Sequence, residues 1–309
     1  MDSKFSDTFI KQFYPNTQVA IQPAPFTILA SPSWRGVDAD AYLVKMSHSQ
    51  HWLKHYFPET QMYINIECSF QAASLAGQLH IAPKVLHADL QQHLLIMRYL
   101  EQPWRVAGLQ DLGCEQIRSN VIAAKKIFQL HATALVSEPA QLIFQQIEDL
   151  AATLRQDAIL CPKNITAWLD YSRQMQQQIE AEGMDLVPCH RDGNVSNIMI
   201  GPDKQIQLID FDLAAQADPF EDIGCFLMEA YESKSDAQSG FEQWQGGFDL
   251  AQFERAWVYG ILDDLRWGLI ALNVASVSER KHLEFAKYGS WRLMRFEENL
   301  AQQRSSLRI

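Results

Sequence analysis

The feature that most constrains this chain is a polar segment, CHRDGNVSNIMI (189–200), that runs directly into a predicted β-hairpin. Its His190, Asp192 and Asn197 fit the spacing H-x-D-x-x-x-x-N. In the following NIMIGPDKQIQLIDFD, two apolar stretches flank Gly-Pro-Asp-Lys, which is a strong turn signal. Asp210 stands at the far end of the second stretch. A loop that continues into a hairpin therefore brings Asp192, Asn197 and Asp210 together.

Three groups of this kind have separate tasks in phosphoryl transfer. One carboxylate accepts the proton of the attacked hydroxyl, while an amide and a second carboxylate hold metal ions that neutralise the triphosphate. Mg²⁺ prefers oxygen ligands and keeps several waters, so one amide oxygen and one carboxylate suffice. The pattern predicts Asp192 as the base and Asn197 and Asp210 as Mg²⁺ ligands, with His190 and Asp222 positioning the loop. One such residue alone would more often only satisfy loop backbone, but the ordered set favours a functional role.

CHRDGNVSNIMI together with LIDFD resembles the aminoglycoside phosphotransferase and choline/ethanolamine kinase superfamily, in its choline kinase-like branch. Protein kinases differ, because they carry Gly where this chain has Asp212. The resemblance spans nearly the whole chain and implies an α+β, bilobal, protein-kinase-like fold. A small β-rich lobe is expected at 1–100 and a larger, mainly helical lobe at 101–309. The implied activity is transfer of phosphate from ATP, with Mg²⁺, to the hydroxyl of a small molecule.

The order of predicted elements agrees with this fold. Segments rich in β-branched and aromatic residues predict strands at 26–31, 41–46 and 51–57, then a helix at 64–77 and strands at 84–89 and 93–100. After Pro103 the pattern becomes that of amphipathic helices, predicted at 115–135, 222–232, 253–276 and 283–303. No internal repeat is visible, so solenoid and propeller architectures are excluded.

Two lysines compete for the phosphate-binding position of the small lobe. Lys54 lies on the predicted third strand and Glu67 on the helix that follows, where a kinase has its phosphate-binding Lys and the ion-pair partner of that Lys. Lys45, on the preceding strand, is the alternative. We favour Lys54 with Glu67, although a solvated strand charge is the simpler explanation for either lysine.

Further nucleotide contacts are expected from a loop and from the link between the lobes. SPSWRGVDAD (31–40) would cover the phosphates, but it has only Gly36 where the family has a glycine-rich, Ser/Asn-containing turn. Arg35 is a candidate phosphate contact, or a simple surface cation. Tyr99 and Leu100 belong to the segment that joins the lobes and would offer backbone groups to adenine.

The acceptor is expected to contact Asp212 and three residues that match choline kinase segments, Glu229, Trp267 and Tyr288. In choline kinases these belong to an acidic and aromatic pocket around a quaternary amine, which cation–π attraction stabilises. Ile270 stands where a second pocket Trp is expected, which leaves room for ethanolamine or another amino alcohol. Packing in a helix core is the alternative for Trp267 and Tyr288, because aromatic residues at helical spacing are usually buried.

Two other functions stay open, namely an aminoglycoside or sugar-hydroxyl kinase and a nucleotide-binding regulatory module with weak catalysis. Lys and Arg total 26 against 37 Asp and Glu, a net charge of −11, which disfavours nucleic acid or an anionic membrane and suits a cationic acceptor. The 5 Cys are scattered, and neither a leader nor a membrane-spanning stretch is evident. We therefore expect a cytoplasmic protein without membrane insertion; the sequence does not indicate its oligomeric state.

Overall fold

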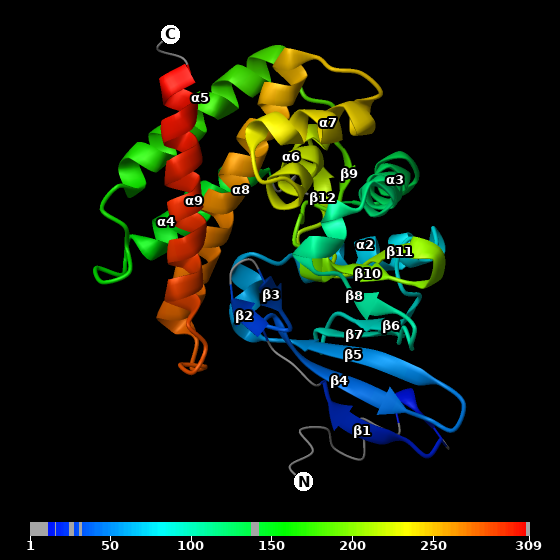
Figure 1. Ribbon diagram of the computed structural model, residues 1–309. Coiled ribbons are helices and arrows are strands. Elements are labelled where there is room, and N and C mark those ends of the chain that lie inside the picture. Colours follow the sequence, from blue (N-terminus) through cyan, green and yellow to red (C-terminus); the bar gives the residue numbers. More distant parts are fainter. Residues whose placement is uncertain (1–11, 16, 25–27, 31–32, 137–141, 307–309) are drawn as a thin grey trace.

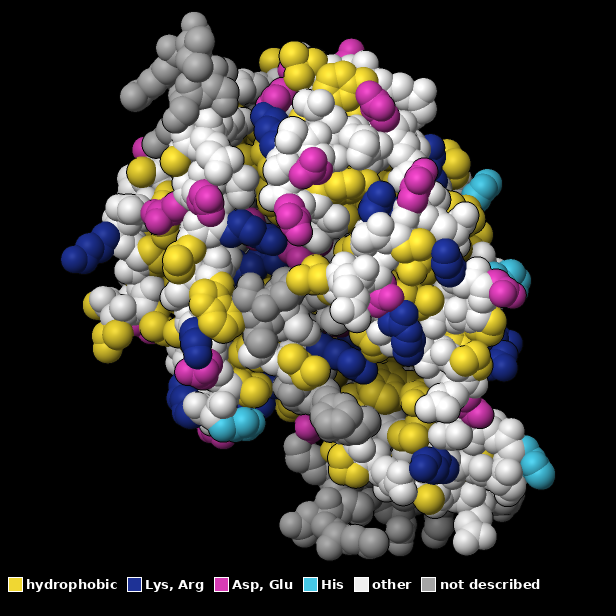
Figure 2. All heavy atoms as spheres, in the orientation of Figure 1, with side chains coloured by type: hydrophobic (Ala, Val, Ile, Leu, Met, Phe, Trp, Pro, Cys, Tyr) yellow, Lys and Arg dark blue, Asp and Glu magenta, His cyan; other side chains and the backbone are white. Residues whose placement is uncertain are grey.

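The computed structural model describes residues 12–306 except 16, 25–27, 31–32 and 137–141. A β-sheet region formed by the first hundred residues is joined to a mainly helical region that contains the rest of the chain (Figure 1). This arrangement confirms the predicted α+β class. Lys, Arg, Asp and Glu side chains are interspersed over the face shown in Figure 2, so the described part of this face has no basic stripe for a polyanion.

The small region is built on one antiparallel sheet with the strand order β1-β4-β5-β7-β6. On one face of this sheet, Val44, Leu53, Leu94 and Ile96 form a compact core of their own together with Tyr14. One helix, α2, follows β5 and begins at an Asn65 cap. The bounds are β1 (Ala20–Pro23), β4 (Ala39–Lys45), β5 (Gln50–Tyr56), α2 (Ile66–Gln78), β6 (Val85–Asp89) and β7 (Leu94–Arg98).

The predicted first strand, 26–31, does not join this sheet. Residues 26–27 and 31 lie outside the described residues, and the remainder is β2 (Ile28–Ala30), which pairs only locally with β3 (Ser33–Arg35) in a separate two-stranded hairpin. The edge position beside β4 is taken instead by β1. The predicted strand is therefore present in part, and its pairing could not be inferred from the sequence, because residue composition reports β propensity but not which strand pairs with it.

The large region is centred on one long helix, α8, which packs against α4, α6 and α9 and is buried on nearly every side. At Gly224 of α6 a Cβ atom would lie 2.0 Å from the carbonyl oxygen of Ala256, so glycine permits the close approach of α6 to α8. The predicted helices correspond to α3 (Glu115–His131), α6 (Pro219–Ala230), α8 (Leu250–Val277) and α9 (Phe285–Ser306), and three more are α4 (Ile143–Leu154), α5 (Ile165–Glu182) and α7 (Lys234–Gln245).

Two small sheets lie where the regions meet. The predicted hairpin is present, with Ile198 opposite Leu208, and its 3₁₀ turn coincides with the Pro-Asp-Lys signal. None of the described helices combines the length and the apolar character needed to cross a bilayer. The remaining elements are β8 (Arg105–Val106), β9 (Val187–Cys189), β10 (Ile198–Ile200), β11 (Ile206–Leu208) and β12 (Ala215–Ala217), with 3₁₀ turns η1 (Pro58–Met62), η2 (Leu109–Gly113), η3 (Val195–Asn197) and η4 (Pro202–Lys204).

Candidate active site

Asp192 is buried in the loop between β9 and β10, and hydrogen bonds fix both of its carboxylate oxygens. Oδ1 accepts from the Asn194 backbone N–H at 2.6 Å, and Oδ2 accepts from Asn197 Nδ2 at 2.8 Å. Burial raises the pKa of Asp192 to about 6, although both of these hydrogen bonds oppose the shift. The carboxylate is therefore oriented, and it can take up a proton close to neutral pH.

A buried lysine of α3 forms hydrogen bonds with this loop and with Asp222. Lys125 Nζ donates to Asp222 Oδ1 at 2.6 Å and to the Asp192 carbonyl at 2.9 Å. Asp222 also accepts the backbone N–H groups of His190 and Arg191, each at 3.1 Å. The sequence predicted that Asp222 positions the loop, and it could do so through these two hydrogen bonds to the loop backbone. Lys125 was missed; the signal was a lysine beside Val121 and Phe128 on an otherwise apolar helix face, where a charge requires a partner.

His190 connects the loop to the hairpin. Its Nε2 lies 3.2 Å from the carbonyl oxygen of Ile209, and its ring meets Phe211 edge-on with centroids 4.6 Å apart. Burial, with Lys125 nearby, lowers the pKa of His190 to about 4, so the imidazole is neutral at physiological pH. A neutral ring held between Ile209 and the loop suits the positioning role predicted for His190.

The backbone of this site is under local strain. Arg191 and Asp210 have φ values of 62° and 67°, a left-handed conformation that non-glycine residues rarely adopt. At Gly193 a Cβ atom would lie 2.0 Å from the carbonyl oxygen of Cys225, so the loop rests directly on the backbone of α6. Strain of this kind persists only where surrounding contacts enforce it, which here means the contacts of Asp222 and α6.

The two carboxylates at the end of the hairpin face the small region. Lys54 Nζ on β5 lies 2.5 Å from Asp210 Oδ1 and 3.0 Å from Asp212 Oδ2. Asp212 also accepts the hydroxyls of Tyr56, at 2.6 Å, and Ser69, at 3.1 Å. Burial alone would raise the pKa of Asp212, but Lys54, with hydrogen bonds from Asp210 and the Tyr56 hydroxyl, holds it below its ordinary value. Asp212 therefore joins the two regions, and its contact with the acceptor stays a prediction.

Lys54 has different partners from those predicted. Glu67 is exposed at the first turn of α2, and the ion pairs of Lys54 are with Asp210 and Asp212. The expected Lys54–Glu67 pair is thus replaced, because the hairpin brings two buried carboxylates to the lysine. Lys45, the alternative lysine, is exposed at the end of β4.

A third carboxylate completes this cluster. Asp38, just before β4, lies with Asp210 and Asp212 so that one oxygen of each is within 4.8 Å of the others. Burial and the charge of Asp212 raise the pKa of Asp38 to about 6. Asn197 lies beside the cluster because its carbonyl accepts the N–H of Ile209 at 2.9 Å. The three clustered carboxylates face one lysine. Together they form an oxygen-rich, negatively charged set of ligands that suits a hard divalent cation such as Mg²⁺.

A pocket opens between the sheet and the hairpin and runs up to these carboxylates, with lining residues that include Lys54, Ala82, Leu95, Met97, Leu208 and Asp210. Of the predicted nucleotide residues, Tyr99 and Leu100 follow β7 directly and are half-buried, and the Tyr99 ring is stacked on Trp52 with centroids 6.1 Å apart. Arg35 is half-buried, and Gly36 adopts φ 62°. Residues 31–32 of the expected phosphate loop lie outside the described residues.

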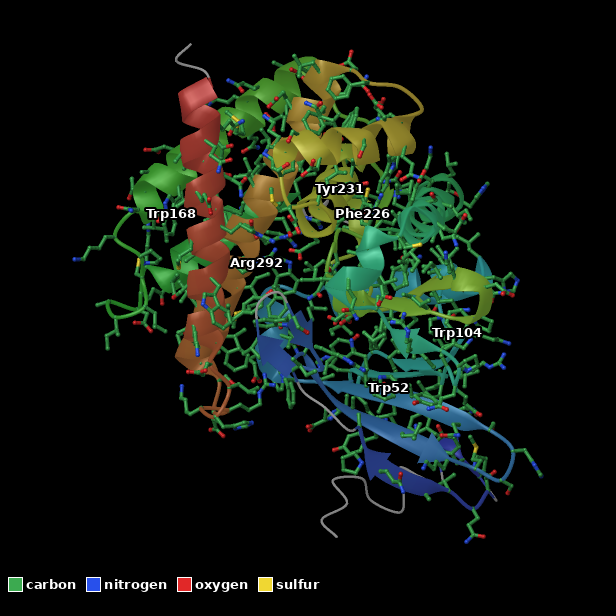
Figure 3. All side chains as sticks on the ribbon, viewed as in Figure 1. Trp52, Trp104, Trp168, Phe226, Tyr231 and Arg292 are labelled. Atoms are coloured by element: carbon green, nitrogen blue, oxygen red, sulfur yellow. The ribbon has the colours of Figure 1, made fainter. Side chains whose placement is uncertain are left out.

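Glu229 differs from its predicted role. It is buried on α6, and its Oε1 accepts from Arg292 at 2.8 Å and from Arg295 at 2.5 Å. Both arginines come from α9, and Figure 3 shows Arg292 where α9 faces α8 and α6. Burial would raise the pKa of Glu229, but the two arginines lower it. Because two guanidinium groups already neutralise this carboxylate, it is not available to pair with a cationic acceptor.

The aromatic residues predicted for the acceptor are close to one another but enclosed. Trp267 and Tyr288 are 6% and 1% exposed, and both contact Trp34, with ring centroids 5.3 and 5.0 Å away. Ile270 is fully buried in α8. The pocket and core interpretations of Trp267 and Tyr288 are therefore both compatible with this geometry, since a small-lobe indole covers the two rings.

Comparison with known proteins identifies the family and the fold. A sequence model of the phosphotransferase enzyme family matches residues 30–265, whereas no curated protein matches the chain. Choline kinase LicA from Streptococcus pneumoniae superposes with a TM-score of 0.76 at 16% identity, over 95% of this chain and 96% of that chain.

Two further structures share the fold. Plasmodium vivax ethanolamine kinase has a TM-score of 0.72 at 16% identity, covering 93% and 84% of the two chains. The GDP complex of aminoglycoside 2'-phosphotransferase-IIIa has a TM-score of 0.63 at 13% identity, covering 96% and 97%. At identities this low, the structural similarity establishes the fold alone. The family match extends over well more than half of the chain. The chain belongs to the phosphotransferase enzyme family.

Proposed function

We propose that this protein transfers the terminal phosphate of ATP to the hydroxyl of a small amino alcohol of the choline or ethanolamine type. The observation that carries the proposal is Asp192, a buried carboxylate held by two hydrogen bonds beside a cluster of metal-type ligands. Asp192 would accept the hydroxyl proton while the acceptor oxygen bonds to the γ-phosphorus and the bond from that phosphorus to the β,γ-bridging oxygen breaks.

The remaining roles follow from position. Asn197 and Asp210 would hold Mg²⁺, with Asp38 and Asp212 close by, and the bound ion would neutralise charge on the triphosphate. Lys54 would contact the phosphates, since its ammonium already lies beside Asp210. Tyr99, Leu100, Arg35 and Gly36 would complete the nucleotide site.

The charges around the catalytic loop favour a small acceptor over a polycationic antibiotic. Five buried acidic residues lie on α6 and α8. Asp222 is paired with Lys125 and the other four with arginine, so this described wall offers no spare negative charge to an aminoglycoside. The pairs join Glu221, Glu229, Asp263 and Asp264 to Arg191, Arg266, Arg292 and Arg295. The structural match to choline and ethanolamine kinases, at TM-scores of 0.76 and 0.72 against 0.63, points the same way.

An ADP-release assay with ATP and Mg²⁺ tests the proposal against choline, ethanolamine, an aminoglycoside and a sugar, each compared with a reaction lacking acceptor. Acceptor-dependent ADP with an amino alcohol is expected. Turnover with the aminoglycoside or sugar alone would replace the proposed acceptor class. ATP binding without acceptor-dependent turnover for any of them would favour a regulatory module.

The pH dependence should report the state of Asp192. A base acts only when deprotonated, and the pKa of Asp192 is about 6, so kcat/KM should rise with pH up to about 6 and then level off. The profile should be measured with choline, which does not titrate in this range. The residual activity of Asp192→Asn should lack the rising limb. A rise that persists in that variant would belong to another group, such as Asp38.

Removal of Asp210 should abolish the Mg²⁺-dependent part of ATP binding. Calorimetry with and without Mg²⁺ measures this part as a ratio of two dissociation constants. We expect Mg²⁺ to tighten ATP binding to the unaltered protein by about tenfold or more and to leave the affinity of Asp210→Ala nearly unchanged. Asp203→Ala, on the exposed turn of the same hairpin, is the control. An unchanged ratio in Asp210→Ala would place the metal elsewhere.

A further inference from the structure

A tryptophan of the small region is buried inside the large one. Trp34, on β3, is only 2% exposed. Its ring lies 5.0 Å from Tyr288, 5.3 Å from Trp267 and 5.6 Å from Phe285, measured between centroids. Trp34 therefore contacts three aromatic residues of α8 and α9 at once.

The element that carries Trp34 is separate from the main sheet. Strands β2 and β3 pair with each other, β2 contacts α9, and β3 contacts the catalytic turn Val195–Asn197. Figure 1 shows this hairpin between one end of α8 and α9 and one end of the strands β4 and β5 that follow it in sequence. The described hairpin thus reaches from the small region to the aromatic residues.

Trp34 also lies between the two halves of the candidate site. Its Nε1 donates to Asp38 Oδ1 at 2.7 Å, and Asp38 belongs to the carboxylate cluster with Asp210. On the other side, β3, which carries Trp34, contacts the turn Val195–Asn197, and Asn197 Nδ2 donates to Asp192 at 2.8 Å. The space occupied by the indole is therefore next to both the metal ligands and the base.

A cation–π contact needs the cation within about 6 Å of a ring centroid, over the face of the ring. The Trp34 ring already lies at 5.0 and 5.3 Å from Tyr288 and Trp267. All four rings are buried to 6% exposure or less, so an onium group and the indole cannot both be in contact with these residues.

We propose that Trp34 is a specificity-determining residue that occupies the position of the acceptor's onium group, so that the acceptor binds by displacing its indole. The inference rests on the proposed function, since it assumes that the enclosed aromatic residues are the acceptor pocket. Displacement gives up the burial of an aromatic side chain and its hydrogen bond to Asp38. Only an acceptor whose cationic or apolar group replaces these contacts binds well, and Trp34 thereby sets the size and affinity of the accepted group.

Calorimetry with tetramethylammonium tests the inference without turnover. Trp34→Ala removes the competing indole, so we expect it to bind tetramethylammonium about tenfold or more tightly than the unaltered protein. The matched control is Trp168→Ala, which truncates a tryptophan of 6% exposure that packs on Phe296. Figure 3 shows Trp168 away from the β2–β3 hairpin, and its removal should leave tetramethylammonium binding unchanged.

Added indole provides a second measurement. In Trp34→Ala it should enter the vacated space and weaken tetramethylammonium binding competitively, as small aromatic molecules enter engineered apolar cavities. In the unaltered protein indole should not compete. Equal tetramethylammonium affinity in all three proteins, or indole that binds Trp34→Ala without competing, would show that Trp34 is simply part of the core and would overturn the inference.

If Trp34→Ala does not fold, Trp34→Leu, which fills more of the space, should also bind tetramethylammonium more tightly, by a smaller factor. No tightening in Trp34→Leu would equally overturn the inference. The result is separable from the proposed function. Indole competition with no acceptor phosphorylated in the ADP assay would keep the pocket and reject the function. Choline phosphorylation with a KM that Trp34→Ala and Trp34→Leu leave unchanged would keep the function and reject the role of Trp34.

Discussion

Replacement of Asp192 by asparagine is expected to lower kcat by about 10²- to 10⁴-fold, the usual contribution of a positioned general base. The amide cannot accept the hydroxyl proton. It keeps the size of the carboxylate, but one of its ends becomes a donor that faces either the Asn194 N–H or Asn197 Nδ2. Steady-state kinetics should therefore show the loss in kcat, whereas calorimetry should show nearly unchanged affinity for ATP.

The matched control for this substitution is Asp203→Asn on the hairpin turn. Asp203 is exposed and has φ 52°, a conformation that asparagine tolerates, so kcat should not change. If Asp192→Asn kept normal turnover, the base would be another group. If it lost ATP affinity to the same extent as turnover, Asp192 would act by holding the loop.

Replacement of Lys125 by methionine should cause the largest loss of stability. Lys125 and Asp222 are 2% and 0% exposed, and Lys125 is the cation that offsets the pull of burial on the Asp222 charge. Loss of one partner of a buried pair leaves an uncompensated charge, which typically costs about 3–5 kcal/mol. Urea denaturation should show the free energy of unfolding reduced by an amount in this range, together with reduced kcat because the Asp192 carbonyl loses its hydrogen bond.

Two further variants define what this loss means. Lys287→Met removes a lysine that is 52% exposed and pairs with Glu284, the residue just before the same helix, so it should change the free energy of unfolding by no more than about 0.5 kcal/mol. Lys125→Met combined with Asp222→Asn removes both buried charges and should be less destabilised than Lys125→Met alone. If Lys125→Met were as stable as the Lys287→Met control, Asp222 would be solvated or otherwise paired.

The catalytic segment could be predicted from the sequence because its information is local. The distance between Asp192 and Asn197 is fixed by a short loop, and a turn with Pro202 and Gly201 closes the hairpin that carries Asp210. Residues this near in sequence stay near in space, and the structure contains both the Asp192–Asn197 hydrogen bond and the hairpin. The helices α3, α6, α8 and α9 were predicted for a similar reason, since periodic apolar residues form a face within one element.

Partners far apart in sequence were not predictable in the same way. Whether Lys54 pairs with Glu67 or with Asp210 depends on which elements meet. Lys54 and Asp210, the residues that do pair, are 156 positions apart in the sequence. Glu229 was expected to face a ligand, but α9 brings Arg292 and Arg295 to it. No residue pattern around Glu229 specifies that neutralisation, because it depends on how α6 and α9 both pack against α8.

The sequence by itself determined the chemistry-bearing loop, the hairpin and the class of fold, because these follow from spacing, turn residues and hydrophobic periodicity within short segments. Only the tertiary structure decided which side chains are buried together. It placed Lys125 under the loop, a third carboxylate beside Asp210 and the Trp34 indole among the aromatic residues of α8 and α9. The physical reason is that burial removes water from a charge or a ring, so its behaviour is set by neighbours that distant parts of the chain supply.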